Sequence, residues 1–410
     1  MKKQILMFGI LVLSFTLFAQ QVTHETLVVN IEVPVRVFKG NQFIDNLTID
    51  DFEVYENGKL QKLEAVYLIN KKDIERKEEK KEFTPDTTRT FYLFFEITEY
   101  SPRIRDAMDY FMQNVLGPED NLIIVSPMKT YEMSSKALKF KSKEAIVDDL
   151  ISLLRKDAMI GSMEYRSAFT DLTRITRSLA GAMAIGVEGQ DEAFDFSEYA
   201  DMDPSVKLEM LLNMYRDVLA RLQQLRYIDE AKLLDFAKTL KNKEGQKCVF
   251  LFYQREFVPQ IEPKILAQTM GEYQDSQNIM QDLENLFYSY RREIGFDVTR
   301  VKQAYSDSSA SIHFMFFSKP ADHIPGIVFQ EHSEDIFTAF TQMATATGGM
   351  TESSSSPYVL FQRAADSFEN YYLLYYTPQN YRRDGQFKNI KVRVKDTTYN
   401  VIHRAGYFAN

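Results

Sequence analysis

The 410-residue sequence has a single cysteine, Cys248, and no tryptophan. One cysteine excludes an intramolecular disulfide and any cysteine-cluster zinc or iron–sulfur site. A basic excess is also missing, because 49 Lys and Arg residues stand against 58 Asp and Glu residues, for a formal net charge of −9. Nucleic-acid-binding proteins usually carry a basic surface, so this composition argues against a DNA or RNA partner.

Enzyme motifs are missing as well. The sequence contains no Walker loop, no Gly-x-Ser-x-Gly elbow, no Gly-x-Gly-x-x-Gly and no His-Glu-x-x-His. Its five histidines include no pair at metal-ligand spacing, and one of them, His313, lies in an apolar run typical of a buried strand. We therefore predict that the protein is not an enzyme, and an exported hydrolase of unrecognised type is the alternative.

The N-terminus has the order of a secretory signal peptide. Lys2 and Lys3 precede the apolar run Ile5–Phe18, and Ala19 offers a small residue for cleavage. The run is shorter than the roughly 20 residues of a membrane-spanning helix, and no later run is longer. We expect residues 1–19 to be removed from an exported protein, periplasmic, envelope-bound or secreted, with no membrane span after cleavage. An uncleaved anchor is the alternative.

Residues 22–70 read as an N-terminal β segment. From Val29 to Val37 every odd position is apolar and every even position is polar or proline, the period-2 pattern of a strand with one solvated face. Pro34 cannot donate a ladder hydrogen bond, so we expect this strand at a sheet edge. The Asn57-Gly58 pair predicts a hairpin.

A charged linker is expected at residues 71–88. Lys71–Glu82 holds six basic residues, five acidic residues and one apolar residue, so it cannot bury a face. We interpret it as a solvated linker or an exposed helix that separates two domains.

The middle of the chain predicts an α/β fold. Continuous apolar runs suit strands that are buried on both faces, and here they alternate with helical patterns, which favours a doubly wound, mostly parallel sheet. These runs are Phe91–Ile97, Leu122–Val125, Cys248–Tyr253 and Ile312–Phe317.

Two long helical patterns, one over residues 204–241 and one from Pro263 onward, predict a projecting antiparallel hairpin. Before them, Glu188–Asp203 holds seven acidic residues and no basic one. It lacks the spacing of a calcium loop, so we interpret it as a solvated loop. The C-terminal segment, 369–410, is again rich in alternating β patterns. We expect it to pair with 22–70 in a β-sandwich-like domain.

Three stretches, Asn46–Val66, Tyr371–Lys395 and Arg404–Phe408, resemble the flanking signatures of the bacterial VWFA-related domain proteins. These are exported proteins with a von Willebrand factor type A-like core. The resemblance implies such a domain at 89–368, with a helical insertion at about 160–305 that has no equivalent in the family.

The resemblance also implies a metal-ion-dependent adhesion site, where the family has Asp-x-Ser-x-Ser after its first strand. The matching residues here are Glu96 and Thr98, which keep oxygen donors, followed by Tyr100, whose ring would crowd an ion. Arg255 stands where the family often has an acid, and its charge would repel a cation. We therefore predict a degenerate site without a cofactor, with Glu96 paired to Arg255 or solvated. Binding of Mg²⁺ or Ca²⁺ is the alternative.

These observations predict an exported, non-enzymatic protein-binding or adhesion module with an unnamed protein partner. The resemblance places its binding face at the C-terminal rim of the strands, and the insertion offers further contacts. A metal-dependent adhesion module or a structural subunit of an envelope complex would fit the same sequence features. Cys248 opens an apolar run, so we expect its thiol to be buried.

Overall fold

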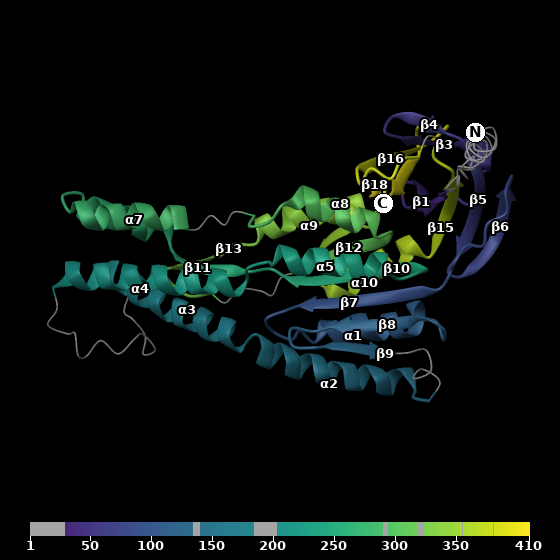
Figure 1. The fold of residues 1–410 in the computed structure, drawn as a ribbon. Helices are drawn as coiled ribbons and strands as arrows, with labels where there is room; N and C mark the ends of the chain where they lie inside the picture. The colour runs from purple at the N-terminus through teal and green to yellow at the C-terminus, as the bar shows by residue number, and fades with distance from the viewer. Residues whose placement is uncertain are drawn as a thin grey trace, which may run out of the picture.

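The computed structural model describes residues 29–133, 140–183, 203–289, 294–317, 323–354, 356–379 and 381–410. Within these ranges the molecule is elongated (Figure 1). A β unit built from both chain ends lies at one end, a central sheet covered by helices lies in the middle, and a helical arm projects at the other end. No helix in the described ranges is long and apolar enough to cross a bilayer. The expected signal peptide, 1–19, lies outside the described residues.

The β unit consists of two antiparallel sheets that curl around one core as a half-barrel. The first sheet has the order β17 (Asn400–His403), β1 (Ile31–Lys39), β15 (Asn370–Tyr376), β5 (Leu63–Asn70) and β6 (Asp73–Glu79), and β2 (Gln42–Phe43) pairs with β1. The second has the order β18 (Gly406–Phe408), β16 (Phe387–Val394), β3 (Phe52–Glu56) and β4 (Lys59–Gln61). Because β1 pairs with β15 and β3 with β16, the two chain ends share both sheets.

Local sequence explains much of this unit. Asn57 and Gly58 have φ values of 46° and 80°, the left-handed conformation that a tight hairpin between β3 and β4 requires. The edge position expected from Pro34 was wrong, since β1 lies between β15 and β17. The pairing of β17 begins only at Val35, so the sheet tolerates a residue without an N–H at the preceding position.

The linker interpretation of Lys71–Glu82 was also wrong, because this stretch forms the edge strand β6, antiparallel to β5. An edge strand needs only one partner and can keep its charged side chains in water. Glu79 still contributes to packing, because its carboxylate accepts a hydrogen bond of 2.6 Å from the buried Tyr67 hydroxyl.

The central sheet has the order β14 (Thr351–Ser354), β12 (Ala310–Phe317), β10 (Gln246–Gln254), β7 (Arg89–Glu96), β8 (Asn121–Val125) and β9 (Thr130–Met133). Its first five strands pair in parallel, and β9 is antiparallel to β8.

The predicted fold class, a doubly wound, mostly parallel type A-like sheet with a β-sandwich-like domain, was therefore wrong. The protein is a mixed α/β molecule whose sheets are mostly antiparallel, with a mixed central sheet and a half-barrel in place of the sandwich. Connection length gives the physical reason. Residues 126–129 are too few for the crossover that parallel strands need, so β9 must return antiparallel.

Helices cover both faces of the central sheet (Figure 1). One face carries α1 (Arg103–Tyr110), a π-helical continuation (Phe111–Val115), α2 (Lys143–Gly161) and α10 (Pro357–Phe368). The other face carries α5 (Glu230–Lys241), α8 (Val298–Asp307) and α9 (Glu334–Ala346). Side chains of β7 alternate between the two hydrophobic cores. Phe91 and Leu93 are buried under α1, α2 and α10, and Tyr92 is buried under α5, α8 and α9.

The arm comprises α3 (Met163–Met183), α4 (Pro204–Leu225), α6 (Pro263–Glu272), α7 (Gln277–Ser289) and the antiparallel pair of β11 (Phe257–Ile261) with β13 (Ile327–Glu331). The single helix expected over 204–241 is divided into α4 and α5, because the Asp229 carboxylate caps α5 through the N–H groups of Ala231 and Lys232. The acidic stretch 188–203 lies outside the described residues except Asp203, which caps α4.

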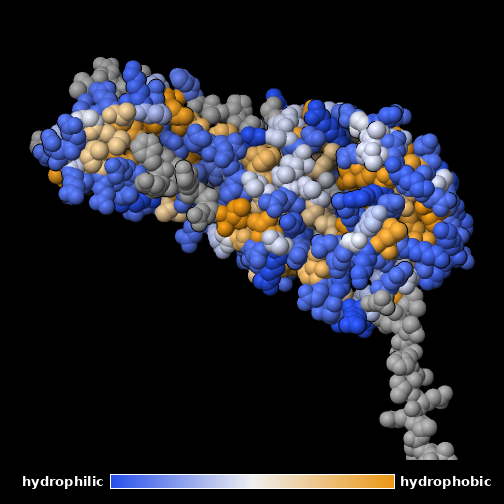
Figure 2. All heavy atoms as spheres, turned by 90° about the horizontal axis from the view of Figure 1, so that it is seen from above, coloured by the Kyte–Doolittle hydropathy of each residue, from blue (hydrophilic) through white to orange (hydrophobic). Residues whose placement is uncertain are grey.

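Buried arginines join the β unit to the central sheet. Arg36 donates hydrogen bonds to the Gly348 carbonyl at 2.6 Å and to the Ser311 hydroxyl at 3.1 Å. Cys248 lies nearby in β10, and its predicted burial is confirmed. Burial raises the pKa of its thiol to about 11. Elsewhere the surface is mostly hydrophilic, and separate apolar areas lie along both arm and body on the face seen in Figure 2.

Candidate functional site

The carboxyl ends of the central strands β7 and β10 lie side by side on the side of the sheet nearest the arm (Figure 1). We call this row of strand ends the edge of the sheet. The two strands are parallel and in register, with Glu96 at the end of β7 opposite Tyr253 near the end of β10. The structure therefore brings the sequence-predicted residues to one sheet edge, which is where open α/β sheets usually bind ligands.

The side-chain amide of Gln254 holds the loop after β7 in place. The Gln254 side-chain oxygen accepts hydrogen bonds from the N–H groups of Thr98, at 3.0 Å, and Glu99, at 3.2 Å, and from the Thr98 hydroxyl, at 3.3 Å. On the α2 side, the Ser162 hydroxyl donates to the Thr98 carbonyl at 2.5 Å. Within the described ranges, no group of three or more His, Cys, Asp or Glu side chains is placed to hold a metal ion.

Glu96 faces the other side of the sheet and lies 3.7 Å from the Arg226 guanidinium. The expected pairing of Glu96 with Arg255 was wrong. After β10 the chain turns toward β11, and Arg255 lies against Glu331, at 3.0 Å, and over the Phe316 ring, 4.5 Å from its centre. Glu96 and Thr98 are thus close in sequence but contribute to different surroundings.

Arg226 follows the last turn of α4 and ties the arm to the sheet edge. Its Nε donates to the Glu256 carboxylate at 2.9 Å, and its guanidinium lies 5.0 Å from the centre of the Tyr253 ring. Glu256 is buried and also accepts the Tyr253 hydroxyl. Burial lowers the pKa of Arg226, but Tyr253, Glu256 and Glu96 outweigh it and hold that pKa well above its usual value.

Sequence reasoning missed Arg226 and Glu256. The only local signal was the capping residue Asp229, which marks the break after α4 and so places Arg226 in a loop. Nothing in the sequence indicated that this loop would reach the end of β10.

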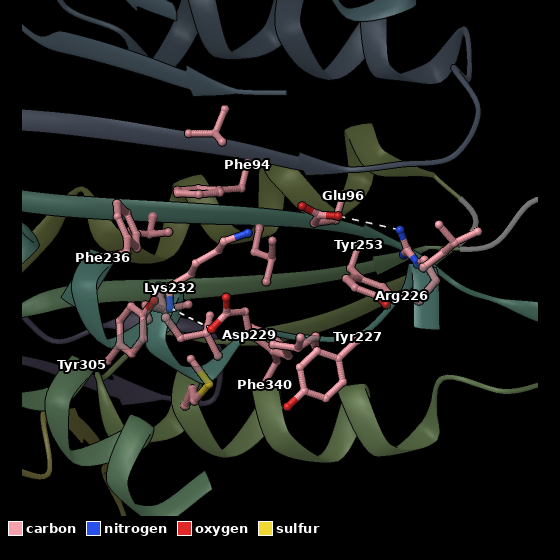
Figure 3. A pocket seen from close by; sticks show the side chains of 18 residues that line it. Phe94, Glu96, Arg226, Tyr227, Asp229, Lys232, Phe236, Tyr253, Tyr305 and Phe340 are labelled. Carbon is pink, nitrogen blue, oxygen red and sulfur yellow. Dashed lines mark hydrogen bonds and ion pairs between the residues drawn. The ribbon is translucent and has the colours of Figure 1, made fainter. Parts of the chain in front are cut away.

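Next to this cluster lies a pocket of about 390 Å³ between the sheet edge and α5 (Figure 3). This volume is within the range of small-ligand sites. Its walls are largely apolar, and aliphatic side chains are joined there by six aromatic ones, Phe94, Tyr227, Phe236, Tyr253, Tyr305 and Phe340. Its charged groups are Glu96, Arg226, Asp229 and Lys232.

The chemistry of the pocket follows from these side chains. The described lining residues include no serine, cysteine or histidine, so the polar contacts available are carboxylate, ammonium, guanidinium and phenol groups. Although half of the Glu96 side chain is exposed, the concave wall desolvates its carboxylate and raises its pKa; Arg226 opposes this shift and Glu256 adds to it. The pocket can therefore hold an apolar group and present a carboxylate to its polar end.

Comparison with known proteins identifies no family. No family model matches the chain, and no curated protein matches it. Among solved structures, the human COPII-coat protein Sec24c is similar at a TM-score of 0.27 and 7% sequence identity, over 80% of this chain and 44% of that chain. This chain thus matches less than half of that protein's length, and so low a TM-score defines neither a shared fold nor a shared function.

Proposed function

We propose that the protein is a non-enzymatic protein-binding module, exported from the cell, that binds its partner at the β7–β10 edge of the central sheet. The observation that carries this proposal is the apolar pocket at that edge, beside the arm, with its six aromatic side chains. Protein interfaces gain most of their energy from a few anchor side chains that fill such pockets. Tyr227 at this pocket is 66% exposed, so its ring is accessible to a partner protein.

We propose further that binding is independent of metal. A hard divalent cation needs several free oxygens around one point. Here the Thr98 hydroxyl and the neighbouring N–H groups are bound to Gln254, and Glu96 faces α5 instead. This arrangement supports the degenerate adhesion site implied by the resemblance to VWFA-related domain proteins.

Export is the part of the proposal that rests on sequence alone, through the signal-peptide pattern of residues 1–19. Cell fractionation with an antibody against the native protein tests it. Recovery of the shortened chain from periplasm, envelope or medium supports export, and recovery of the full-length chain from cytoplasm contradicts it.

Capture from an envelope extract tests the binding face. The wild-type protein is immobilised and compared with Tyr227→Ser at the pocket and Leu60→Ser in the β unit, where Leu60 is 57% exposed. Both changes remove an exposed apolar side chain and should leave folding intact. We expect one stoichiometric partner to be retained by the wild type and Leu60→Ser and lost by Tyr227→Ser. Equal capture by all three would contradict the proposed face.

Metal independence has its own test. Calorimetric titration with Mg²⁺, Mn²⁺ and Ca²⁺ should give no saturable heat, and chelation with EDTA should leave capture of the partner unchanged. Saturable binding that Glu96→Ala abolishes would assign the edge to a metal-dependent adhesion site instead.

A further inference from the structure

The pocket and its immediate support carry a surplus of negative charge. Three carboxylates, those of Glu96, Asp229 and Glu256, surround two cations, Arg226 and Lys232. Arg226 is already neutralised, because Glu256 lies 2.9 Å from its Nε. The charge left at the pocket therefore favours a cationic occupant.

Glu96 is the carboxylate that can accept further hydrogen bonds from a ligand. Asp229 already accepts two N–H groups at the start of α5, at 2.9 Å and 3.3 Å. Glu96 accepts no hydrogen bond from the described residues, and its ion pair with Arg226 spans 3.7 Å, beyond hydrogen-bond length. A partly desolvated carboxylate without a donor gains strongly from a ligand that supplies one.

The walls of the pocket suit the rest of such a ligand. Aromatic faces attract cations and pack well against methylene chains. Figure 3 shows the Lys232 side chain extending into the pocket, toward the space between Phe94 and Glu96. Its ammonium forms no ion pair among the described residues, and Lys232 is exposed, so it can turn out into solvent. The protein thus shows that an alkylammonium chain fits the space.

We propose that the pocket receives a lysine or arginine side chain of the protein partner, with its aliphatic stem between the aromatic walls and its cation on the Glu96 carboxylate. The bound side chain takes the place of Lys232, which moves out into solvent. This inference rests on the proposed protein-binding function and names the chemistry of the anchor residue.

Three probes of one length test the charge preference: hexylammonium, 1-hexanol and hexanoate, titrated into the full protein by ligand-observed NMR. Hexylammonium should bind about tenfold or more tightly than hexanoate, with hexanol between them, because a hydrogen bond to a charged group is worth roughly a tenfold change or more. Tighter binding of hexanoate, or equal binding of all three, would overturn the proposal.

Two variants should change hexylammonium binding in opposite directions. Glu96→Gln keeps the size of the side chain and should weaken binding about tenfold. Lys232→Met removes the competing ammonium and should strengthen it about two- to fivefold. Glu99→Gln is the matched control, since Glu99 is exposed at the same edge but does not line the pocket, and it should change nothing. No effect of Glu96→Gln, or weaker binding by Lys232→Met, would refute the assignment.

The two proposals fail separately. Loss of the captured partner in Tyr227→Ser without any preference for hexylammonium would keep the binding face and discard the cationic anchor. A clear hexylammonium preference with unchanged capture would keep a cation site and move the protein-binding face elsewhere.

Discussion

Asp120→Asn is the most informative test of how the β unit and the central sheet stabilise each other. The Asp120 side chain is fully buried and accepts Arg89 Nη2 at 2.6 Å, Lys72 Nζ at 2.8 Å and the Gly117 N–H at 2.7 Å. Lys72 comes from the turn between β5 and β6, so this carboxylate binds both units. An asparagine keeps the shape but leaves the buried Arg89 without its counter-charge. Breaking such a pair costs about 3–5 kcal/mol of unfolding free energy.

Urea unfolding at pH 7, followed by circular dichroism, measures that cost. Asp148→Asn serves as the control, because its ion pair with Arg105 is exposed to solvent and should contribute little to stability. If Asp120→Asn lowers the unfolding free energy no more than Asp148→Asn does, the buried pair does not stabilise the protein and the reasoning fails.

The same comparison has a defined pH dependence. Burial alone would raise the pKa of Asp120, but the hydrogen bonds from Arg89 and Lys72 outweigh it and hold that pKa below its usual value. A depressed pKa stabilises the folded state above the unfolded value of about 3.9 and loses this effect as the pH falls through the folded value. The difference between wild type and Asp120→Asn should stay constant from pH 7 to about 5 and shrink only below about 4. A difference that shrinks near neutral pH would point to another group.

Two further predictions concern backbone packing and the lone thiol. Gly349→Ala would place a Cβ atom 1.7 Å from the Ile312 carbonyl oxygen and should lower the free energy of unfolding in urea by about 3 kcal/mol or more. In the control, Gly271→Ala, the added Cβ meets nothing within 4 Å, so stability should be equal or slightly higher. Equal effects of the two changes would contradict the close approach at Gly349. Cys248 is 5% exposed and has a raised pKa, so an aromatic disulfide reagent should label it slowly at pH 8 and rapidly in denaturant; rapid labelling of the native protein would show that the strand is accessible.

The sequence predicts the elements of this fold better than their arrangement. The four continuous apolar runs fall on β7, β8, β10 and β12, because burial on both faces leaves a pattern that needs no knowledge of neighbours. Strand β6 was missed since its charged residues say nothing about the partner β5 that orders them. The predicted mostly parallel sheet was wrong, because strand direction depends on connection lengths and on which distant strands meet.

The candidate site could be located but not assembled from sequence. Glu96 and Thr98 were correctly expected near a strand end, yet the strand stops at Glu96, so period-2 alternation no longer fixes where Thr98 faces. Gln254 and Arg226 complete the two surroundings from positions more than a hundred residues away. Such contacts depend on tertiary packing, for which a single sequence contains no pattern.

The shared strands of the β unit also fix how the protein carries mechanical load. Strand β1 pairs with β15 and β17, and β18 is hydrogen-bonded to Ser306 and Asp307 of α8. A pull between the residues before β1 and those after β18 therefore acts first on the β unit and on its contact with α8. The central sheet and the arm lie in the chain between β6 and β15, so apart from the contact with α8 they bear the force only after the β unit opens. An optical-trap experiment should therefore show the β unit yielding first, with the pocket edge still folded.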